Sequence, residues 1–332
     1  MSPAPALDGG LIIDKPSGPT SHDVVAVARR ALGERRIGHT GTLDPLATGV
    51  LVLLVGRATR LSQFLVGEDK EYLADVRLGV STPTYDATSL GEAMREAGGA
   101  IGEGRGANGE GGGATDDHIE EVLGRFRGTF LQTPPAHSAK KVGGARAYES
   151  ARRNEPVDLQ PVEVTVRELE IIAPVAAPTE DPTRPSPLPV RPSLLRLRVV
   201  CSSGFYVRSL AHDLGQALGC GAHLEGLRRT RAGEFRIGQA ISLDTLANDP
   251  EGARAALLPM NALLAAYAPI TLSEEGARRA AHGNAVMPEH VAGRPAALAH
   301  DARVRLVDAS GRLVAIAEAR ADLVLHPVTV LV

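Results

Sequence analysis

The stretch GHTGTLDPLATGVL, residues 38–51, gathers residues that could do chemistry into a short space. Its one carboxylate, Asp44, stands between a glycine-rich turn and Pro45, and an apolar, strand-like run follows. Asp-Pro often starts a turn, so a loop aspartate without a chemical role is one interpretation. The other is a nucleophile at the rim of a core, where a carboxylate needs a partner. Such a carboxylate can add covalently to a substrate and divide a hard step into easier ones.

Arg208 is the candidate partner of Asp44, because an opposite charge nearby favours an ionised carboxylate. It lies in CSSGFYVRS, between a predicted strand and a predicted helix. A surface arginine is the alternative, since most arginines are exposed. Four more candidates are Lys15, His39, Tyr72 and Tyr206. If they are not site residues, Lys15 is a solvated turn lysine, His39 a loop histidine, and the two tyrosines are core residues.

Several chemistries lack their motifs. The ten histidines are scattered without H-E-x-x-H, and Cys201 and Cys220 form no paired C-x-x-C. No G-x-S-x-G occurs, and the glycine-rich stretch 91–115 contains no G-x-x-x-x-G-K-[ST]. We therefore expect no metal and no cofactor. The lack of a disulfide framework, a signal peptide and a long apolar span predicts a cytoplasmic protein that does not enter a membrane.

Hydrophobic periodicity predicts a mixture of helices and strands that is compatible with the α+β class. Ser21 is the expected N-cap of the first helix, and Gly33 its end. The strands are expected at 10–16, 49–56, 70–79 and 194–204, and the helices at 22–33, 58–67, 116–128 and 206–219.

A length of 332 residues favours about two domains. A change in composition at 265–271 predicts a boundary there, with one domain at 1–265 and a second at 266–332. The second contains a short helix, 273–283, and a hairpin, 304–319, typical of a small β-rich module. Low-complexity composition predicts two loop insertions in the first domain: 91–115, rich in glycine, and 174–193, rich in proline.

The charge pattern allows a polyanionic partner despite a net charge of −3. Local field, rather than net charge, steers such a partner. Aromatic residues make up 3% of the chain, so any base stacking must depend on one or two placed rings. The candidate phosphate contacts are Arg60, Lys140, Lys141, Arg146, Arg152, Arg153, Arg228, Arg229 and Arg231.

Together these segments resemble the TruB family of tRNA pseudouridine synthases. The matching pieces occur in the family's order over most of residues 10–240, whereas the stretch after 265 resembles the PUA-type RNA-binding domain only loosely. They are GLIIDKPSGPTSHDVV, RIGHTGTLDPLATGVLVLLVGRATRLSQFL, KEYLADVRLG, QTPPAHSAKKVGGARAYESAR and CSSGFYVRSLAHDLGQALGCGAHLEGLRRTRAGEF.

The resemblance implies a pseudouridine-synthase fold, with a mixed, largely antiparallel sheet flanked by helices and a small PUA-like C-terminal module. It implies isomerisation of uridine 55 in the T-arm loop of tRNA, with Asp44 as nucleophile and a flipped-out base. Tyr72 would stack on that base, and Arg208 would pair with Asp44. The remaining implied site residues are a second tyrosine, Tyr206, a pocket leucine, Leu227, a histidine that holds the flipped nucleotide, His39, and a supporting lysine, Lys15.

Three points stay open at the level of sequence. Asp44 could attack C6 of the base or C1′ of the ribose, and Tyr72 could assist as a base, although an un-ionised phenol is a weak one. A non-catalytic RNA-binding protein or tRNA-folding chaperone on the same scaffold is an alternative, as is action on another RNA. A phosphate-binding hydrolase would need a cluster of metal-binding carboxylates near Asp44, and the sequence shows none. Protein partners and oligomeric state are not visible.

The insertion at 91–115 leaves every quoted motif intact, which generates the first prediction. Deletion of residues 92–114 should leave turnover of T-arm RNA nearly unchanged, because insertions in surface loops are readily removed. Turnover and the thermal unfolding midpoint of the shortened and full chains would be compared side by side. Loss of turnover at an unchanged midpoint would show that the insertion takes part in the reaction.

Overall fold

The computed structural model describes residues 7–91, 116–137, 141–142, 145–146, 159–175, 194–293, 298–320 and 324–332. Most of the two predicted insertions lies outside these ranges, as do Lys140, Arg152 and Arg153. The chain divides into two compact units. Unit 1 comprises Met1–Pro45, Gly49–Gly67 and Phe235–Val332, and unit 2 comprises Leu46–Thr48 and Glu68–Glu234.

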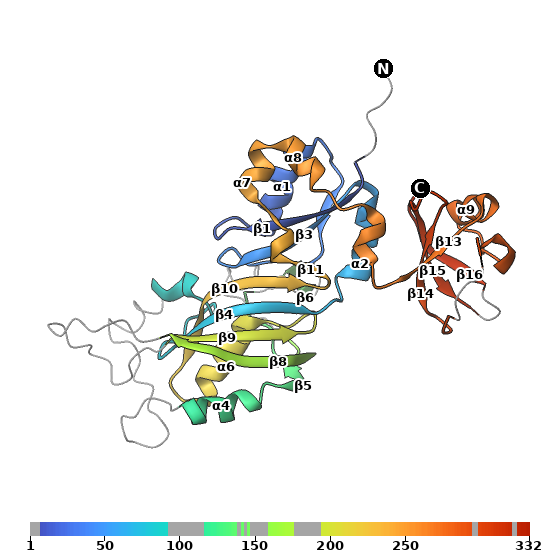
Figure 1. Ribbon diagram of the computed structural model, residues 1–332. Coiled ribbons are helices and arrows are strands. Elements are labelled where there is room, and N and C mark those ends of the chain that lie inside the picture. Colours follow the sequence, from blue (N-terminus) through green and yellow to red (C-terminus); the bar gives the residue numbers. More distant parts are fainter. Residues whose placement is uncertain are drawn as a thin grey trace. The chain divides into compact units, whose positions relative to one another are not determined.

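Unit 1 contains a mixed sheet covered by helices. Strand β1 (Gly9–Lys15) pairs antiparallel with β3 (Thr48–Val55), which also pairs antiparallel with β2 (Ile37–His39). The short β12 (Ile241–Ser242) joins β1 in parallel. Three helices pack together beside these strands (Figure 1): α1 (Ser21–Leu32), α7 (Leu243–Asn248) and α8 (Pro250–Ala255).

Helix α1 confirms the predicted helix but begins at a different cap. Thr20, not Ser21, is the N-cap: its hydroxyl accepts from the Asp23 N–H, while the Asp23 carboxylate accepts from the Thr20 N–H. This reciprocal pair satisfies two of the free N–H groups that every helix start leaves. Gly33 ends the helix in the left-handed conformation with φ +68°, as expected. The predicted helix at 58–67 is instead a 3-10 turn, η1 (Gly56–Leu61), followed by one α-turn, α2 (Ser62–Leu65).

Residues 268–330 of unit 1 form a separate four-stranded sheet with its own apolar core. The order is β13 (Ala268–Thr271), β14 (Arg303–Val307), β15 (Leu313–Ala319) and β16 (Leu325–Val330), with α9 (Glu274–Ala281) packed against it. The predicted short helix and hairpin are therefore confirmed. The 3-10 turns η4 (Met260–Leu264) and η5 (Pro288–His290) flank β13 and α9 along the chain.

This module is joined to the rest of unit 1 by side-chain bonds to backbone carbonyls. Arg305, 9% exposed, donates to the carbonyls of Tyr267 and Ala265 and to Asn261 in the preceding linker. Arg60 donates to the Val330 carbonyl over 2.7 Å. The predicted phosphate contact at Arg60 is thus already engaged with the last strand of the module.

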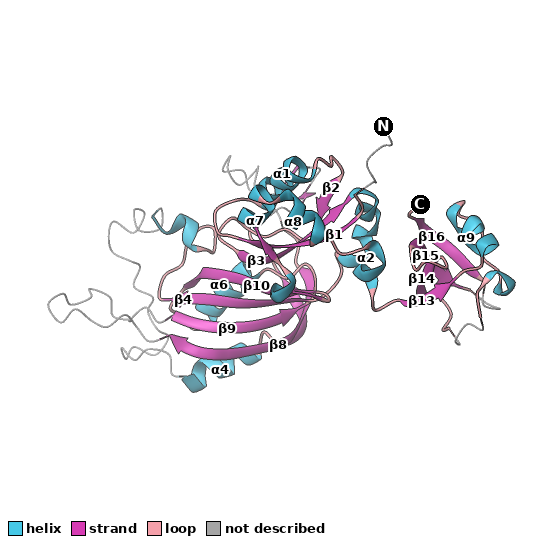
Figure 2. Cartoon of the chain, turned by 45° about the horizontal axis from the view of Figure 1, so that its top comes forward, coloured by secondary structure: helices cyan, strands magenta, loops and turns pink. Residues whose placement is uncertain are grey.

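Unit 2 is built on an antiparallel sheet with the order β10-β4-β9-β8-β5 (Figure 2). Its members are β4 (Lys70–Leu78), β5 (Gly128–Gln132), β8 (Val162–Val175), β9 (Leu194–Cys201) and β10 (Ala222–Ala232). Strand β8 runs through Pro174 and Val175, which pair with β9, so the proline-rich insertion starts later than 174. The remaining elements are η2 (Ala87–Ser89), α4 (Asp116–Gly124), α6 (Val207–Ala217), the hairpin strands β6 (Lys141–Val142) and β7 (Ala145–Arg146), and after unit 2 β11 (Phe235–Arg236) and η3 (Ile237–Gln239).

The two faces of this sheet differ sharply in chemistry. Strand β4 alternates as predicted, burying Tyr72, Ala74, Val76 and Leu78 on one face. Helix α6 packs against β4 and β10, and α4 contacts α6, so we call this the covered face. The other, polar face carries ion pairs across the strands: Asp75–Arg196, Glu71–Arg198, Arg198–Glu168 and Arg77–Glu225.

A polar cluster is buried within the covered face. Lys70 lies opposite Cys201 in the β4–β9 register, and Arg229 lies opposite Tyr72 in the β10–β4 register. Lys70 is 7% exposed and donates to the Glu68 carbonyl over 2.5 Å. Its burial and then the positive charge of Arg229 lower the pKa of Lys70 to about 8, while burial raises the pKa of Cys201 to about 12.

The depressed pKa of Lys70 predicts a rise of stability with pH. Between about 8 and the ordinary value of 10.5, the unfolded chain holds a proton on Lys70 that the folded chain does not hold. The Lys70 contribution to the free energy of unfolding therefore increases as pH rises through this window. Urea unfolding of the native protein and of Lys70→Met at about pH 7.5 and about pH 9.5 should show the difference shifting in favour of the native protein.

Cys201 acts in the opposite direction above its ordinary pKa, since the folded chain then keeps a proton that the unfolded chain loses. Repeating the comparison in Cys201→Ala protein removes that contribution. A difference that does not change between the two pH values would contradict the placement of Lys70.

Candidate active site

The Asp44 loop is held through the backbone on both sides of the carboxylate. The Lys15 amine donates to the carbonyls of Pro16 (2.8 Å) and Pro45 (3.2 Å), and the Gly18 N–H donates to the same Pro45 carbonyl over 2.8 Å. Lys15 is completely buried, so it is not a solvated turn lysine. Gly18 has φ +109°, a conformation in which a side chain would be strained. The turn 15–18 therefore anchors the residue that follows Asp44.

The residue before Asp44 is anchored by Ser21. The Ser21 hydroxyl donates to the Leu43 carbonyl over 3.1 Å and accepts from the Leu43 N–H over 2.9 Å. Because Thr20 caps α1, the buried Ser21 hydroxyl is available for this reciprocal pair. Asp44 itself is half-buried. The DKPSGPTS stretch thus explains the stiffness of the Asp44 loop, since Lys15 and Gly18 bond the Pro45 carbonyl and Ser21 bonds both backbone groups of Leu43.

His39 lies at the end of β2, five residues before Asp44 in unit 1. Its half-buried ring makes an edge-to-face contact with His22 of α1, with ring centroids 5.6 Å apart and planes at 84°. His39 therefore belongs to the same anchored part of unit 1 as the Asp44 loop, on the strand that leads into it.

Tyr72 and Leu227 lie together on the covered face of unit 2. Leu227 pairs with Ala74, and Arg229 pairs with Tyr72. Directly opposed residues of an antiparallel pair point to the same face, so Leu227 is a diagonal neighbour of Tyr72. Arg228 points to the opposite face and donates to the Thr48 hydroxyl over 3.4 Å. Arg228 and Arg229 therefore cannot both contact the same phosphate from these strands, and Arg229 is only 2% exposed.

Arg208 begins α6 on this same side of the sheet, as the second residue of the helix. It is 6% exposed, so it is not a surface arginine. Its guanidinium donates to the carbonyls of Thr84 (3.2 Å) and His137 (3.0 Å) and lies 3.7 Å from the Asp86 carboxylate. Three groups from two segments, both distant in the sequence from Arg208, thus orient one cation.

Asp86 is the residue that the sequence interpretation missed. It is 4% exposed and accepts hydrogen bonds from the Thr84 hydroxyl (2.7 Å) and the Thr88 N–H (3.0 Å). The run TYDATS does indicate a cap, and Asp86 is indeed the N-cap of η2. Its second role, the ion pair with Arg208, depends on a contact across 122 positions that no local pattern contains.

Tyr206, the N-cap residue of α6, is held by Gln132 at the end of β5. The Tyr206 N–H donates to the Gln132 amide oxygen over 2.8 Å, and the Gln132 amide donates to the Tyr206 carbonyl over 3.0 Å. This pair fixes the start of α6, and with it Arg208. Of the other predicted phosphate contacts, Lys141 and Arg146 lie in the β6–β7 hairpin and Arg231 lies in β10.

Within the residues that the structure describes, no three His, Cys, Asp or Glu side chains are grouped so as to hold a metal ion. No helix in the described ranges is long and apolar enough to span a membrane.

An antiparallel sheet with a tyrosine, a leucine and an oriented arginine on one side, in a chain that also anchors an aspartate loop, is compatible with the class of RNA pseudouridine synthases, which are isomerases. Comparison with known families agrees. The model "TruB family pseudouridylate synthase (N terminal domain)" matches residues 29–207, and "tRNA pseudouridylate synthase B C-terminal domain" matches 208–265. The chain belongs to the TruB family.

Similar proteins extend this agreement along the chain. A tRNA pseudouridine synthase B of Solibacter usitatus is 42% identical over 98% of this chain and 100% of the relative. One from Deinococcus radiodurans is 47% identical over 72% of this chain and 79% of the relative. The fold is similar to that in a crystal structure of the archaeal box H/ACA sRNP Nop10–Cbf5 complex, with a TM-score of 0.66, 25% identity and coverage of 98% of this chain and 86% of that chain. The family model and this solved structure confirm the α+β pseudouridine-synthase fold.

The buried Lys15 amine generates a prediction about the Asp44 loop. Lys15→Met removes a donor from the Pro16 carbonyl and one of the two donors to the Pro45 carbonyl, and each lost hydrogen bond costs about 0.5–1.5 kcal/mol. We expect a lower free energy of unfolding by urea and, at a temperature where the variant is still folded, slower turnover. Ser17→Ala, in the same turn with an exposed side chain, is the matched control and should behave like the native protein. A Lys15→Met protein with native stability and turnover would refute the anchoring role.

Proposed function

We propose that the protein converts uridine 55 in the T-arm loop of tRNA to pseudouridine, with Asp44 as the nucleophile. The observation that carries the proposal is the backbone anchoring of Leu43 and Pro45, which presents one carboxylate in a stiff loop. A stiff loop lowers the entropic cost of aiming the nucleophile at a reacting carbon. The names of the relatives support tRNA as the substrate.

The proposed reaction exchanges one bond to the ribose for another. A carboxylate oxygen of Asp44 adds to C6 of the flipped uracil or to C1′ of the ribose, and the N1–C1′ bond breaks. The uracil turns, a C5–C1′ bond forms, the hydrogen leaves C5 as a proton, N1 takes up a proton from solvent, and the Asp44 carboxylate is released. Either site of attack needs the same ionised aspartate, so the structure of Asp44 is compatible with both.

The other residues assist in this scheme. Arg208 keeps Asp44 ionised and aimed, which its own fixed orientation between the Thr84 and His137 carbonyls supports. Tyr72 stacks on the flipped base, with Leu227 beside it on the covered face. Lys15 and His39 support the pocket, as the family resemblance implies. Stacking and phosphate contacts offset the few kcal/mol that base flipping costs.

The RNA contacts that we propose are narrower than the sequence suggested. Lys141 and Arg146 lie on a hairpin, a suitable element for phosphate binding. Burial of Arg229 and the bond of Arg60 to Val330 favour structural roles for those two arginines. Specificity then depends on the shape of the folded T-arm and its unstacked loop bases. The cytoplasm, where tRNA is modified, is the compartment that we propose.

Release of tritium from C5 tests the proposal directly. T-arm RNA labelled at C5 of uridine 55 should lose its label with the native protein and keep it with Asp44→Asn, because the amide is a far weaker nucleophile. Asp244→Asn, an exposed carboxylate in α7, is the matched control and should leave release unchanged. Arg208→Ala should lose most of its turnover and still bind the RNA.

The outcomes separate the alternatives. RNA labelled only at uridine 54 should keep its tritium, and release from it would contradict the position. Normal release by Asp44→Asn would overturn the nucleophile. A native protein that binds and refolds tRNA without releasing label would instead be a non-catalytic RNA chaperone.

A further inference from the structure

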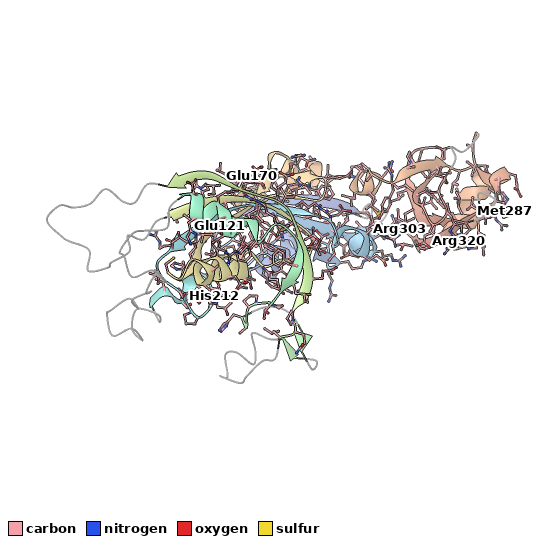
Figure 3. The ribbon with its side chains drawn as sticks, turned by 90° about the horizontal axis from the view of Figure 1, so that it is seen from below. Glu121, Glu170, His212, Met287, Arg303 and Arg320 are labelled. Atoms are coloured by element: carbon pink, nitrogen blue, oxygen red, sulfur yellow. The ribbon has the colours of Figure 1, made fainter. Side chains whose placement is uncertain are left out.

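A stacked pair of rings, Tyr85 and His212, lies next to the Arg208 contact and has no role in the mechanism above. The ring centroids are 3.8 Å apart and the planes are inclined by only 14°. His212 lies on α6 and Glu170 on β8, at opposite sides of the sheet, so the stack is on the side of Tyr72 and Arg208 (Figure 3). Both rings are half-buried.

The geometry of α6 links the stack to Arg208. Residues four apart lie one above the other on a helix, so Arg208 and His212 share a face of α6. The segment 84–86 lies against both. Thr84 accepts from the guanidinium, Asp86 pairs with it at 3.7 Å, and Tyr85, between them in the chain, stacks on His212. Three successive residues, 84–86, thus contact two successive turns of α6 on one face of the helix.

The backbone of Tyr85 is in a strained conformation. Tyr85 has φ +64°, and the only other non-glycine residue with a positive φ in the described ranges is Asp301. A bulky residue rarely adopts this conformation unless its surroundings hold it there. The Tyr85 N–H donates to the Thr82 carbonyl over 3.1 Å, and its carbonyl accepts from the Leu224 N–H over 2.9 Å. The second bond ties the turn to β10, while the ring adds to the contacts that Thr84 and Asp86 make with α6.

The imidazole is suited to stacking rather than to hydrogen bonding at Nδ1. Nδ1 of His212 is buried and has no hydrogen-bond partner among the described residues. Burial lowers the pKa of His212 and raises that of Tyr85, so both rings are neutral near pH 7. Two neutral aromatic rings stacked nearly parallel attract each other through the contact of their faces.

From this geometry we infer that the Tyr85–His212 stack is a positioning device for Arg208. It holds the strained 84–86 turn on α6, so that the Thr84 carbonyl and the Asp86 carboxylate keep the guanidinium in its reactive orientation. Tyr85 and His212 touch no reacting atom in this account. The inference rests on the proposed function, because it concerns the arginine that serves Asp44.

The test separates a flat ring from mere bulk at position 212. His212→Phe keeps the stack, whereas His212→Leu keeps apolar volume without a flat face. We expect single-turnover tritium release to be near native in His212→Phe and slower by roughly tenfold or more in His212→Leu, since small misplacement of a catalytic group has effects of this size. RNA affinity should stay native in both. Gln216→Ala, one turn further along α6 and exposed, is the control that should change nothing.

A second pair of variants tests the turn itself. Tyr85→Asn keeps a residue that tolerates a positive φ but removes the ring, and it should slow release as His212→Leu does. The double variant, Tyr85→Asn with His212→Leu, should be no slower than the slower of the two single variants, because both substitutions remove the same contact. Equal rates in His212→Phe and His212→Leu, whether native or slow, would overturn the inference, as would full additivity in the double variant.

The controls distinguish this failure from failure of the proposed function. If the native protein releases no tritium, or Asp44→Asn releases it normally, the proposed function is wrong and the stack has nothing to position. If those two behave as expected and Tyr85→Asn remains at the native rate, only the positioning role is wrong. Thermal unfolding of each variant identifies any that is not folded, and the Phe–Leu comparison at position 212 then decides alone.

Discussion

A buried lysine amine must find acceptors, and Lys15 finds them in the carbonyls of Pro16 and Pro45, beside Asp44. Pro45 has no N–H, so the residue after Asp44 cannot enter a sheet ladder through a backbone donor. Lys15 and Gly18 supply the hydrogens to its carbonyl instead, and Ser21 does the same for Leu43. The backbone on both sides of Asp44 is therefore held by Lys15, Gly18 and Ser21, which suits the carboxylate that we propose as the nucleophile.

Arg208, a cation, is likewise held in place by hydrogen bonds to the backbone. Two of its donors are used by the Thr84 and His137 carbonyls, which orient the plane of the guanidinium without neutralising it. Asp86, at 3.7 Å, is the charge partner that makes burial of this cation affordable. Since an arginine stays protonated in proteins, the arrangement gives a permanent positive charge of fixed direction, as the role that we propose for Arg208 requires.

The helices and strands whose formation depends on neighbouring residues were predicted from local sequence patterns. The alternation KEYLADVRLG identified β4 and its buried face, and the stripe in YVRSLAHDLGQALG identified α6. Ser21 was misassigned as a cap because serine is a good cap residue, whereas the reciprocal bonds of Thr20 with Asp23 and of Ser21 with Leu43 distinguish the two. Lys15 and Arg208 are buried, and Arg208 pairs with Asp86, through contacts between distant segments. Local patterns do not contain such contacts. The family resemblance pointed to Lys15 and Arg208 but not to Asp86.

The distribution of charge explains why arginine counts mislead about RNA binding. On the polar face of unit 2, Arg196 and Arg77 each pair with one carboxylate and Arg198 with several. These cations bring little surplus charge to that face, so a polyanion gains little there beyond what water offers. The covered face instead presents Tyr72, Leu227 and Arg208, whose positive charge is shared with one nearby acid. A net charge of −3 is thus compatible with the RNA binding that we propose, because local field rather than net charge steers a polyanion.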